Sequence, residues 1–154
     1  MRRQPAVIVF FCLLVSMASS GCSSRGVVDA EQDKKAAIKE IQLLHERINS
    51  EQYGLIHDDA CAFWRQSFNR ESTIQVMKDT RQDIGKFVRI TDKHSRIEVF
   101  TDRTPVEIRA AYTAEYEKGE VLELYTYIKE GRKVKLLLFK LHKLASEQET
   151  NPKQ

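Results

Sequence analysis

The hydrophobic pattern of the chain changes its period once, close to Phe87. Before this point apolar residues recur every three or four positions, which is the spacing of one helix face. After it they alternate with polar residues, which is typical of a strand with one buried side. Parallel βαβ units would need helices and strands to alternate along the chain, and here all helices come first. We therefore expect an α+β fold with helices packed on an antiparallel sheet.

The helical part of the pattern predicts three helices. The first spans about residues 30–51, and Tyr53-Gly54 interrupts it. The second begins at Asp58 or Asp59 and ends at Phe68, with one apolar face made of Cys61, Trp64 and Phe68.

The third predicted helix has the clearest boundaries. Ser72 and Gln75 have the spacing of a capping box, in which each side chain accepts a hydrogen bond from the other residue's backbone N–H. Gly85 is suited to end the helix, because glycine readily adopts the backbone conformation that follows a last turn. Arg81 lies on the apolar stripe of this helix, where it could reach the rim or pair with a carboxylate such as Asp83 or Glu98.

The alternating part of the pattern predicts a curled antiparallel sheet of about four strands. Strand-like residues begin near Val88, and turns at Lys118-Gly119 and Gly131-Arg132 separate the later strands into hairpins. Tyr112 and Tyr125 fall on faces that we expect to be buried. Acidic residues are assigned to the opposite face (Glu107, Glu115 and Glu123), although the run VLELYTYI around Glu123 can be read in either register.

This order of elements resembles the cystatin-like superfold, which includes nuclear transport factor two, ketosteroid isomerase and many small bacterial lipoproteins of unknown function. The resemblance covers residues 30–143 and is clearest in the segment Arg81…Ile84-Gly85, directly before the first strand. It implies a cleft between helices and sheet. It implies no particular activity, because this fold is shared by binders, enzymes and scaffolds.

The first 21 residues have the composition of an export signal. Arg2 and Arg3 precede an apolar run from Ala6 to Ala18. As a helix this run would span about 20 Å at roughly 1.5 Å per residue, which is short of the roughly 30 Å of bilayer hydrocarbon. The run therefore favours a removable signal peptide over a membrane span.

The signal ends in Ser19-Ser20-Gly21-Cys22, which resembles the lipobox of bacterial lipoproteins. Ser19 departs from that family, which usually has leucine there, and cleavage after Ala18 or an uncleaved signal anchor are the alternatives. The resemblance implies that Cys22 carries acyl chains such as palmitate, which hold the protein to a lipid bilayer. It also implies a place in a bacterial cell envelope: the outer membrane, facing the periplasm, in a Gram-negative cell, because no Asp follows Cys22.

These features predict four segments: a signal peptide over 1–21, a tether over 22–29, a cystatin-like domain over 30–144 and a polar tail over 145–154. The formal charge is +3, and it falls to +1 once Arg2 and Arg3 leave with the signal, so we expect no nucleic-acid partner. Cys61 would be the one thiol left without lipid, so the domain must be stable without an intramolecular disulfide.

One pair of residues has the spacing of a chemical site. His57 and Cys61 are four positions apart and could hold a metal or activate the thiol. The remaining histidines are scattered, and Cys61 fits an apolar helix face. We therefore predict a structural cysteine, with no metal and no cofactor.

The cleft candidates are two aromatic helix residues, one arginine and two strand tyrosines: Trp64, Phe68, Arg81, Tyr112 and Tyr125. We find no general base on the predicted inner faces, so we predict a non-catalytic module that binds an envelope protein or a small apolar ligand. A small enzyme using the same cleft and a structural envelope protein are the alternatives. A buried carboxylate or histidine in the cleft would favour an enzyme. A cleft filled by aromatic residues would favour a binding module.

The last hairpin is basic. Its five cations are Arg132, Lys133, Lys135, Lys140 and Lys143. We predict an exposed sheet edge whose charges deter strand pairing, with contact to anionic lipid headgroups as the alternative.

Overall fold

A computed structural model describes residues 22–144. The predicted signal peptide and polar tail lie outside these residues, and so do the side chains of residues 22–28 and 92–94, including that of Cys22. Four helices come first: α1 (Cys22–Asn49), α2 (Tyr53–Asp59), α3 (Ala62–Ser67) and α4 (Arg70–Ile84). Four strands follow: β1 (Phe87–Phe100), β2 (Glu107–Tyr116), β3 (Gly119–Glu130) and β4 (Lys133–Lys143).

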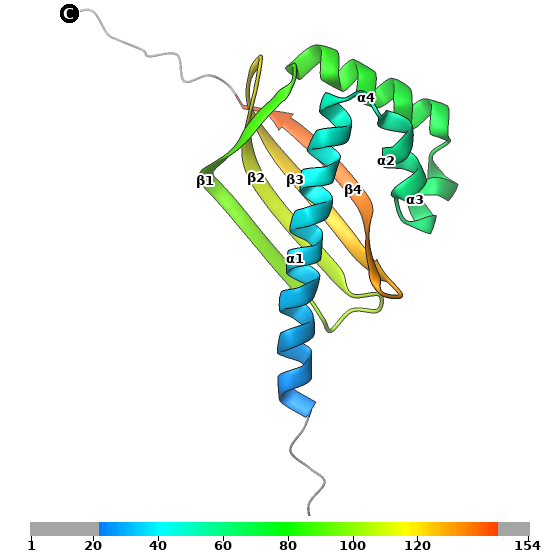
Figure 1. Cartoon of the computed structure of the whole chain (residues 1–154), viewed down its shortest axis with the longest axis vertical. Coiled ribbons are helices and arrows are strands. Elements are labelled where there is room, and N and C mark those ends of the chain that lie inside the picture. The colour runs from blue at the N-terminus through cyan, green and yellow to red at the C-terminus, as the bar shows by residue number, and fades with distance from the viewer. Residues whose placement is uncertain (1–21, 145–154) are drawn as a thin grey trace, which may run out of the picture.

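The strands form one antiparallel sheet in the order β1-β2-β3-β4, so each strand pairs with the next along the chain (Figure 1). The predicted α+β class and the sheet of about four strands are confirmed. Three register shifts interrupt the pairing of the described strands. Two are in β1, between Phe87 and Arg89 and between Thr91 and Ser95, and one is in β4, where Leu137 is inserted opposite the Thr126–Tyr127 step. Within residues 22–144, β1 and β4 are the two edges of the sheet.

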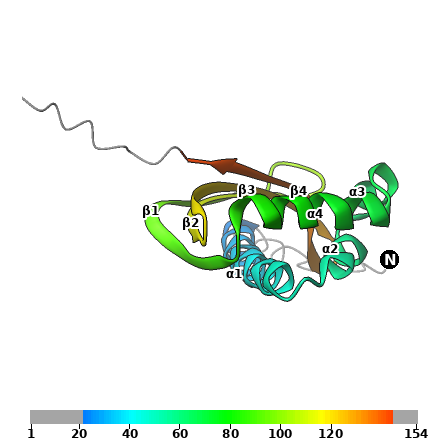
Figure 2. The ribbon, with the colours of Figure 1, turned by 90° about the horizontal axis from the view of Figure 1, so that it is seen from above.

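Helix α1 lies across one face of the sheet, which we call the inner face (Figures 1 and 2). Its buried residues recur at helical spacing, from Ala37 through Ile41 and Leu44 to Ile48. They pack against the alternate residues of the strands, among them Ile108, Tyr125 and Leu136. Burial of apolar surface stabilises such a contact by about 25 cal/mol for each Å² removed from water.

Polar contacts hold α1 to the sheet near each end of the contact. The side chain of Asn49 donates to the carbonyl of Phe87 and accepts from its N–H, both at 2.9 Å. Toward the other end, Lys129 of β3 lies 2.8 Å from Asp33. The N-terminal turns of α1 project beyond the sheet (Figure 1). The helix begins at Cys22, eight residues before the predicted start near residue 30, so it includes the segment that was predicted as a tether.

The second predicted helix is two helices in the structure. The chain is helical from Tyr53 instead of being interrupted there, and it is extended at Ala60 and Cys61, with ψ angles of 167° and 162°. This break lets the N–H of Cys61 donate to the carbonyl of Leu136 at 2.9 Å. A contact with β4 therefore replaces one helical hydrogen bond, which local spacing could not predict.

The predicted capping box of α4 is also wrong. Asn69 is the N-cap, and its side chain accepts from the N–H of Ser72 at 2.7 Å. Gln75 instead donates to Asp79 one turn later. Gly85 ends the helix as predicted, with φ of 83° and ψ of −166°, a combination open essentially only to glycine.

Candidate functional site

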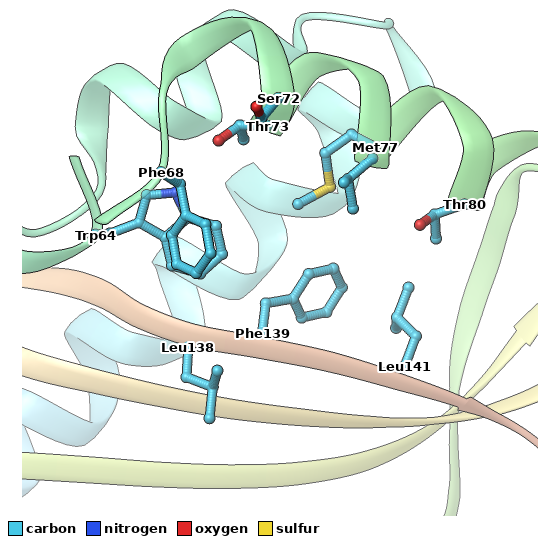
Figure 3. Close-up of a pocket in the computed structure, with 10 residues that line it drawn as sticks. Trp64, Phe68, Ser72, Thr73, Met77, Thr80, Leu138, Phe139 and Leu141 are labelled. Carbon is cyan, nitrogen blue, oxygen red and sulfur yellow. The ribbon is translucent and has the colours of Figure 1, made fainter. Parts of the chain in front are cut away.

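A groove between α4 and β4 is the candidate binding site (Figure 3). Its volume is about 350 Å³, at the lower end of the range for small-molecule sites. Its walls are mainly apolar and come from three elements: Trp64 and Phe68 from α3 and its C-terminal end, Val76 and Met77 from α4, and Phe139 and Leu141 from β4. We call this space the α4–β4 groove.

The orientation of the β4 side chains creates the floor of the groove. In Figure 3, Phe139 and Leu141 point from the strand toward α4, whereas Leu138 points away on its other side. Phe139 stacks on Tyr125 with 5.0 Å between ring centroids, so the core holds the floor in place. The polar groups of the groove are the hydroxyls of Ser72, Thr73 and Thr80, and Thr73 donates its own to the carbonyl of Asn69.

The wall at the α3 end exposes aromatic surface. Phe68 was predicted to be buried, which is wrong: it is 49% exposed, because α3 ends at Ser67 and Phe68 is extended. Its ring lies 5.2 Å from that of Trp64, and the two rings overlap in Figure 3. The indole Nε1 of Trp64 is buried and has no hydrogen-bond partner in the described residues. Val76 across the groove is 59% exposed, which makes this opening strongly apolar for a surface site.

The five residues predicted for one cleft lie in three places. Trp64 and Phe68 line the α4–β4 groove. Tyr112 and Tyr125 belong to the core beneath α1. Arg81 lies outside both and is 3.7 Å from Glu117, which replaces the predicted partners Asp83 and Glu98.

A second feature is a buried polar cluster made of His45, Tyr116, Glu123 and Tyr125. Nε2 of His45 lies 3.0 and 3.1 Å from the two carboxylate oxygens of Glu123. Tyr116 donates its hydroxyl to one of these oxygens at 2.5 Å, and Tyr125 donates to the other at 2.9 Å. Three donors thus surround one carboxylate, and the ring of His45 is stacked on Phe87 at 3.7 Å.

The burial of Glu123 corrects the sequence prediction. We expected this side chain on the outer, solvated face, but it is 0% exposed and points to the inner face together with Val121, Tyr125 and Tyr127. The alternate residues of β3 face the other side of the sheet. The ambiguous run VLELYTYI therefore buries Val121, Glu123, Tyr125 and Tyr127 instead of the residues between them. The sequence did not predict that Glu123 would pair with His45.

The cluster changes the acidity of its tyrosines. Burial, and secondly the negative charge of Glu123, raises the pKa of Tyr116 and of Tyr125 well above the ordinary value of 10.0. Burial also raises the pKa of Tyr127. All three hydroxyls therefore stay protonated at neutral pH, and two of them act as donors to Glu123.

The cluster and the groove are adjacent but separate. Leu141 pairs with Glu123 across the β3–β4 ladder, and Phe139 pairs with Tyr125. The two residues that form the floor of the groove thus lie between it and the cluster. All members of the cluster are buried, so a ligand in the groove would meet apolar side chains and not the carboxylate.

His57 and Cys61 do not meet as a chemical pair. His57 makes hydrogen bonds with the carbonyl of Phe68 at 3.0 Å and with Asp58 at 3.3 Å. The buried sulfur of Cys61 accepts from the N–H of Trp64 at 3.4 Å, as the N-cap of α3. Among the described side chains, no group of three or more His, Cys, Asp or Glu residues is close enough to hold a metal ion.

Comparison with known proteins gives no family: no family model matches the chain, and no curated protein does. In residues 22–144, no helix combines the length and the apolar character that a membrane span requires.

Proposed function

We propose that this protein is a lipid-anchored binding module of a bacterial cell envelope, and that it holds an apolar ligand in the α4–β4 groove. The observation that carries the proposal is the exposed apolar lining of the groove. Phe68 and Val76 are each about half exposed and face one pocket of about 350 Å³. Apolar side chains gathered around a concavity mark a ligand or partner site more specifically than the same residues scattered over a surface.

The position of the groove is consistent with an anchor at Cys22. Helix α1 has 28 residues from Cys22 to Asn49, or about 42 Å at roughly 1.5 Å per residue. The groove is lined by α4 and β4, and Figure 1 shows α4 beside the C-terminal end of α1, at the end of the domain opposite to the projecting N-terminal turns of that helix. A lipid on Cys22 would thus leave the groove directed away from the membrane that holds the protein.

A small enzyme is the second candidate, because Glu123 and His45 are groups capable of acid–base chemistry. Binding is favoured over catalysis because Phe139 and Leu141 separate these groups from the groove. An enzyme using Glu123 would require these two side chains to move aside.

Binding of N-phenyl-1-naphthylamine, a neutral apolar probe whose fluorescence rises in apolar surroundings, tests the proposal. The full chain would carry Cys22→Ser so that it can be studied without detergent. Val76→Arg places a charge in the groove and should weaken binding of the probe at least tenfold. Val88→Arg is the matched control, since Val88 is 53% exposed on β1 and does not line the groove. No binding, or equal binding by both variants, would overturn the proposal.

A further inference from the structure

The free edge of β4 forms one side of the α4–β4 groove. The register of the hairpin determines which backbone groups face away from β3. The N–H of Leu144 donates to the carbonyl of Glu120, so these two residues form a hydrogen-bonded pair. Such pairs alternate along an antiparallel ladder, which places Phe139 and Leu141 at non-hydrogen-bonded positions. Their N–H and C=O groups therefore point outward from the sheet edge, beside the opening of the groove.

The chain itself already uses one site on this edge. The N–H of Cys61 donates to the carbonyl of Leu136, and the backbone around it is extended as in a strand. The pairing stops there because α3 begins at Ala62. Beyond Leu136, the edge continues past Phe139 and Leu141 without a neighbouring strand in the described residues.

We propose that the occupant of the groove is an extended segment of another protein, with alternating apolar and acidic residues, that adds a strand to the edge of β4. This inference rests on the proposed function and names the kind of partner. Strand addition is a common mode of peptide recognition, in which the main chain supplies affinity and alternate side chains supply specificity.

The two sides of β4 explain the alternation. On the inner side, an added strand would place its side chains between Phe139 and Leu141 of β4 and the residues of α4 that line the groove, Val76 and Met77, where apolar groups fit. On the outer side its side chains would lie beside Lys140, which is exposed. Residues of a strand point to opposite sides in turn, so the complementary sequence alternates in the same way.

The charge of β4 selects the partner. The strand contains four lysines, Lys133, Lys135, Lys140 and Lys143, and no acidic residue. A second copy of this chain, paired edge to edge, would bring two rows of lysines together, which opposes self-association. An acidic segment meets the same charges favourably, so the lysines both prevent pairing between copies and favour a partner of opposite charge.

Fluorescence anisotropy with a labelled peptide of four Val-Glu repeats tests this inference on the full chain carrying Cys22→Ser. The peptide should bind and displace N-phenyl-1-naphthylamine. A Val-Lys peptide should bind at least tenfold more weakly. A Val-Glu peptide methylated on alternate backbone nitrogens should also bind at least tenfold more weakly, because it keeps the side chains but loses the N–H groups that would pair with β4.

Two lysine variants localise the contact. Lys140→Glu, beside the groove, should weaken binding of the Val-Glu peptide about tenfold. Lys133→Glu is the matched control: it lies seven residues away, roughly 23 Å along a strand, well beyond the screening length of about 8 Å at physiological salt. Its effect should stay below about threefold. Equal effects of the two substitutions would overturn the inference.

The remaining outcomes separate the two proposals. If the probe binds in a Val76-dependent way but the Val-Glu peptide does not bind, the strand partner is wrong and the apolar site stands. If neither binds, both are wrong. If removal of residues 145–154 raises peptide affinity tenfold, the chain's own C-terminal segment occupies the edge and the partner proposal is overturned.

Discussion

Nε2 of His45 in α1 lies 3.0 Å from Oε1 of Glu123 in β3, a contact between residues 78 positions apart in the chain. Both side chains are buried, and Glu123 has no exposed surface. The hydroxyls of Tyr116 and Tyr125 donate to the same carboxylate. A buried carboxylate is costly unless its acceptor sites are filled, so these three donors are what allow Glu123 to lie beneath the helix.

Glu123→Gln should reduce the free energy of unfolding by about 2–4 kcal/mol, because the amide brings donors where His45 and the tyrosines already donate. Urea unfolding followed by circular dichroism measures the change. Glu115→Gln is the matched control: Glu115 pairs with Arg89 at the surface, where loss of an ion pair costs below about 1 kcal/mol. Similar losses in both variants would contradict the structural role of the cluster.

Alkaline pH should destabilise the protein through its buried tyrosines. The pKa values of Tyr116, Tyr125 and Tyr127 are raised above 10.0 in the folded state, chiefly by burial. In the unfolded chain these hydroxyls ionise near pH 10, so the unfolded state binds fewer protons above that pH. The free energy of unfolding is therefore unaffected by these groups below about pH 9 and falls as the pH rises through 10 toward the folded pKa values. Tyr116→Phe should make the fall shallower, and an unchanged slope would argue against this assignment.

Gly85→Ala should destabilise the protein by at least about 2 kcal/mol. The φ of Gly85 is +83°, and an added Cβ would lie 2.6 Å from the Cβ of Glu117. Gly131 has φ of +62° with no atom within 4 Å of such a Cβ, so Gly131→Ala tests the backbone conformation alone and should cost about 1 kcal/mol. Thermal unfolding of the two variants gives the comparison. A smaller loss at position 85 than at 131 would contradict the close approach of Gly85 to Glu117.

Cys61→Ala should lower the free energy of unfolding by about 1–2 kcal/mol, because it removes a buried sulfur and a weak cap of α3. Binding of the apolar probe should be unchanged. In the native protein the thiol should react slowly with alkylating reagents, since it has no exposed surface. A loss of probe binding without loss of stability would assign the thiol a direct role.

Cys22→Ser should release the protein from the membrane fraction of cells, because acyl chains contribute about 0.8 kcal/mol for each buried methylene. Cys12→Ser is the matched control: Cys12 lies within the predicted signal, and the protein should still sediment with membranes. Mass spectrometry of the mature N-terminus should find acylated Cys22. An unmodified N-terminus in a freely diffusing protein would end the lipoprotein proposal.

The elements with the strongest local patterns were predictable. The period of the apolar residues identified α1, and glycines identified the end of α4 at Gly85 and the β2–β3 and β3–β4 turns, because these features depend on neighbours within a few positions. The N-cap of α4 and the break at Cys61 were not predictable in this way. Asn and Ser are nearly equally favourable as N-cap residues, so local sequence does not decide between Asn69 and Ser72. The break at Cys61 depends on a hydrogen bond to Leu136 in β4.

The candidate site was only partly visible in the sequence. Trp64 and Phe68 were recognised as a pair, and both line the groove. Their partners Phe139 and Leu141 lie in an apolar run, and only the bulge at Leu137 determines which residues of that run face α4. Tyr112 and Tyr125 were assigned to the same cleft, but the helix that covers them is α1 and not α4.

By itself, the sequence determined the class of fold, because the period of the apolar residues selects helix or strand locally. It left open the face on which Glu123 lies, since both registers of β3 bury apolar residues. The tertiary structure decided that choice. A carboxylate can be buried only where donors meet it, and those donors come from α1 and β2 as well as β3, which folding alone brings together.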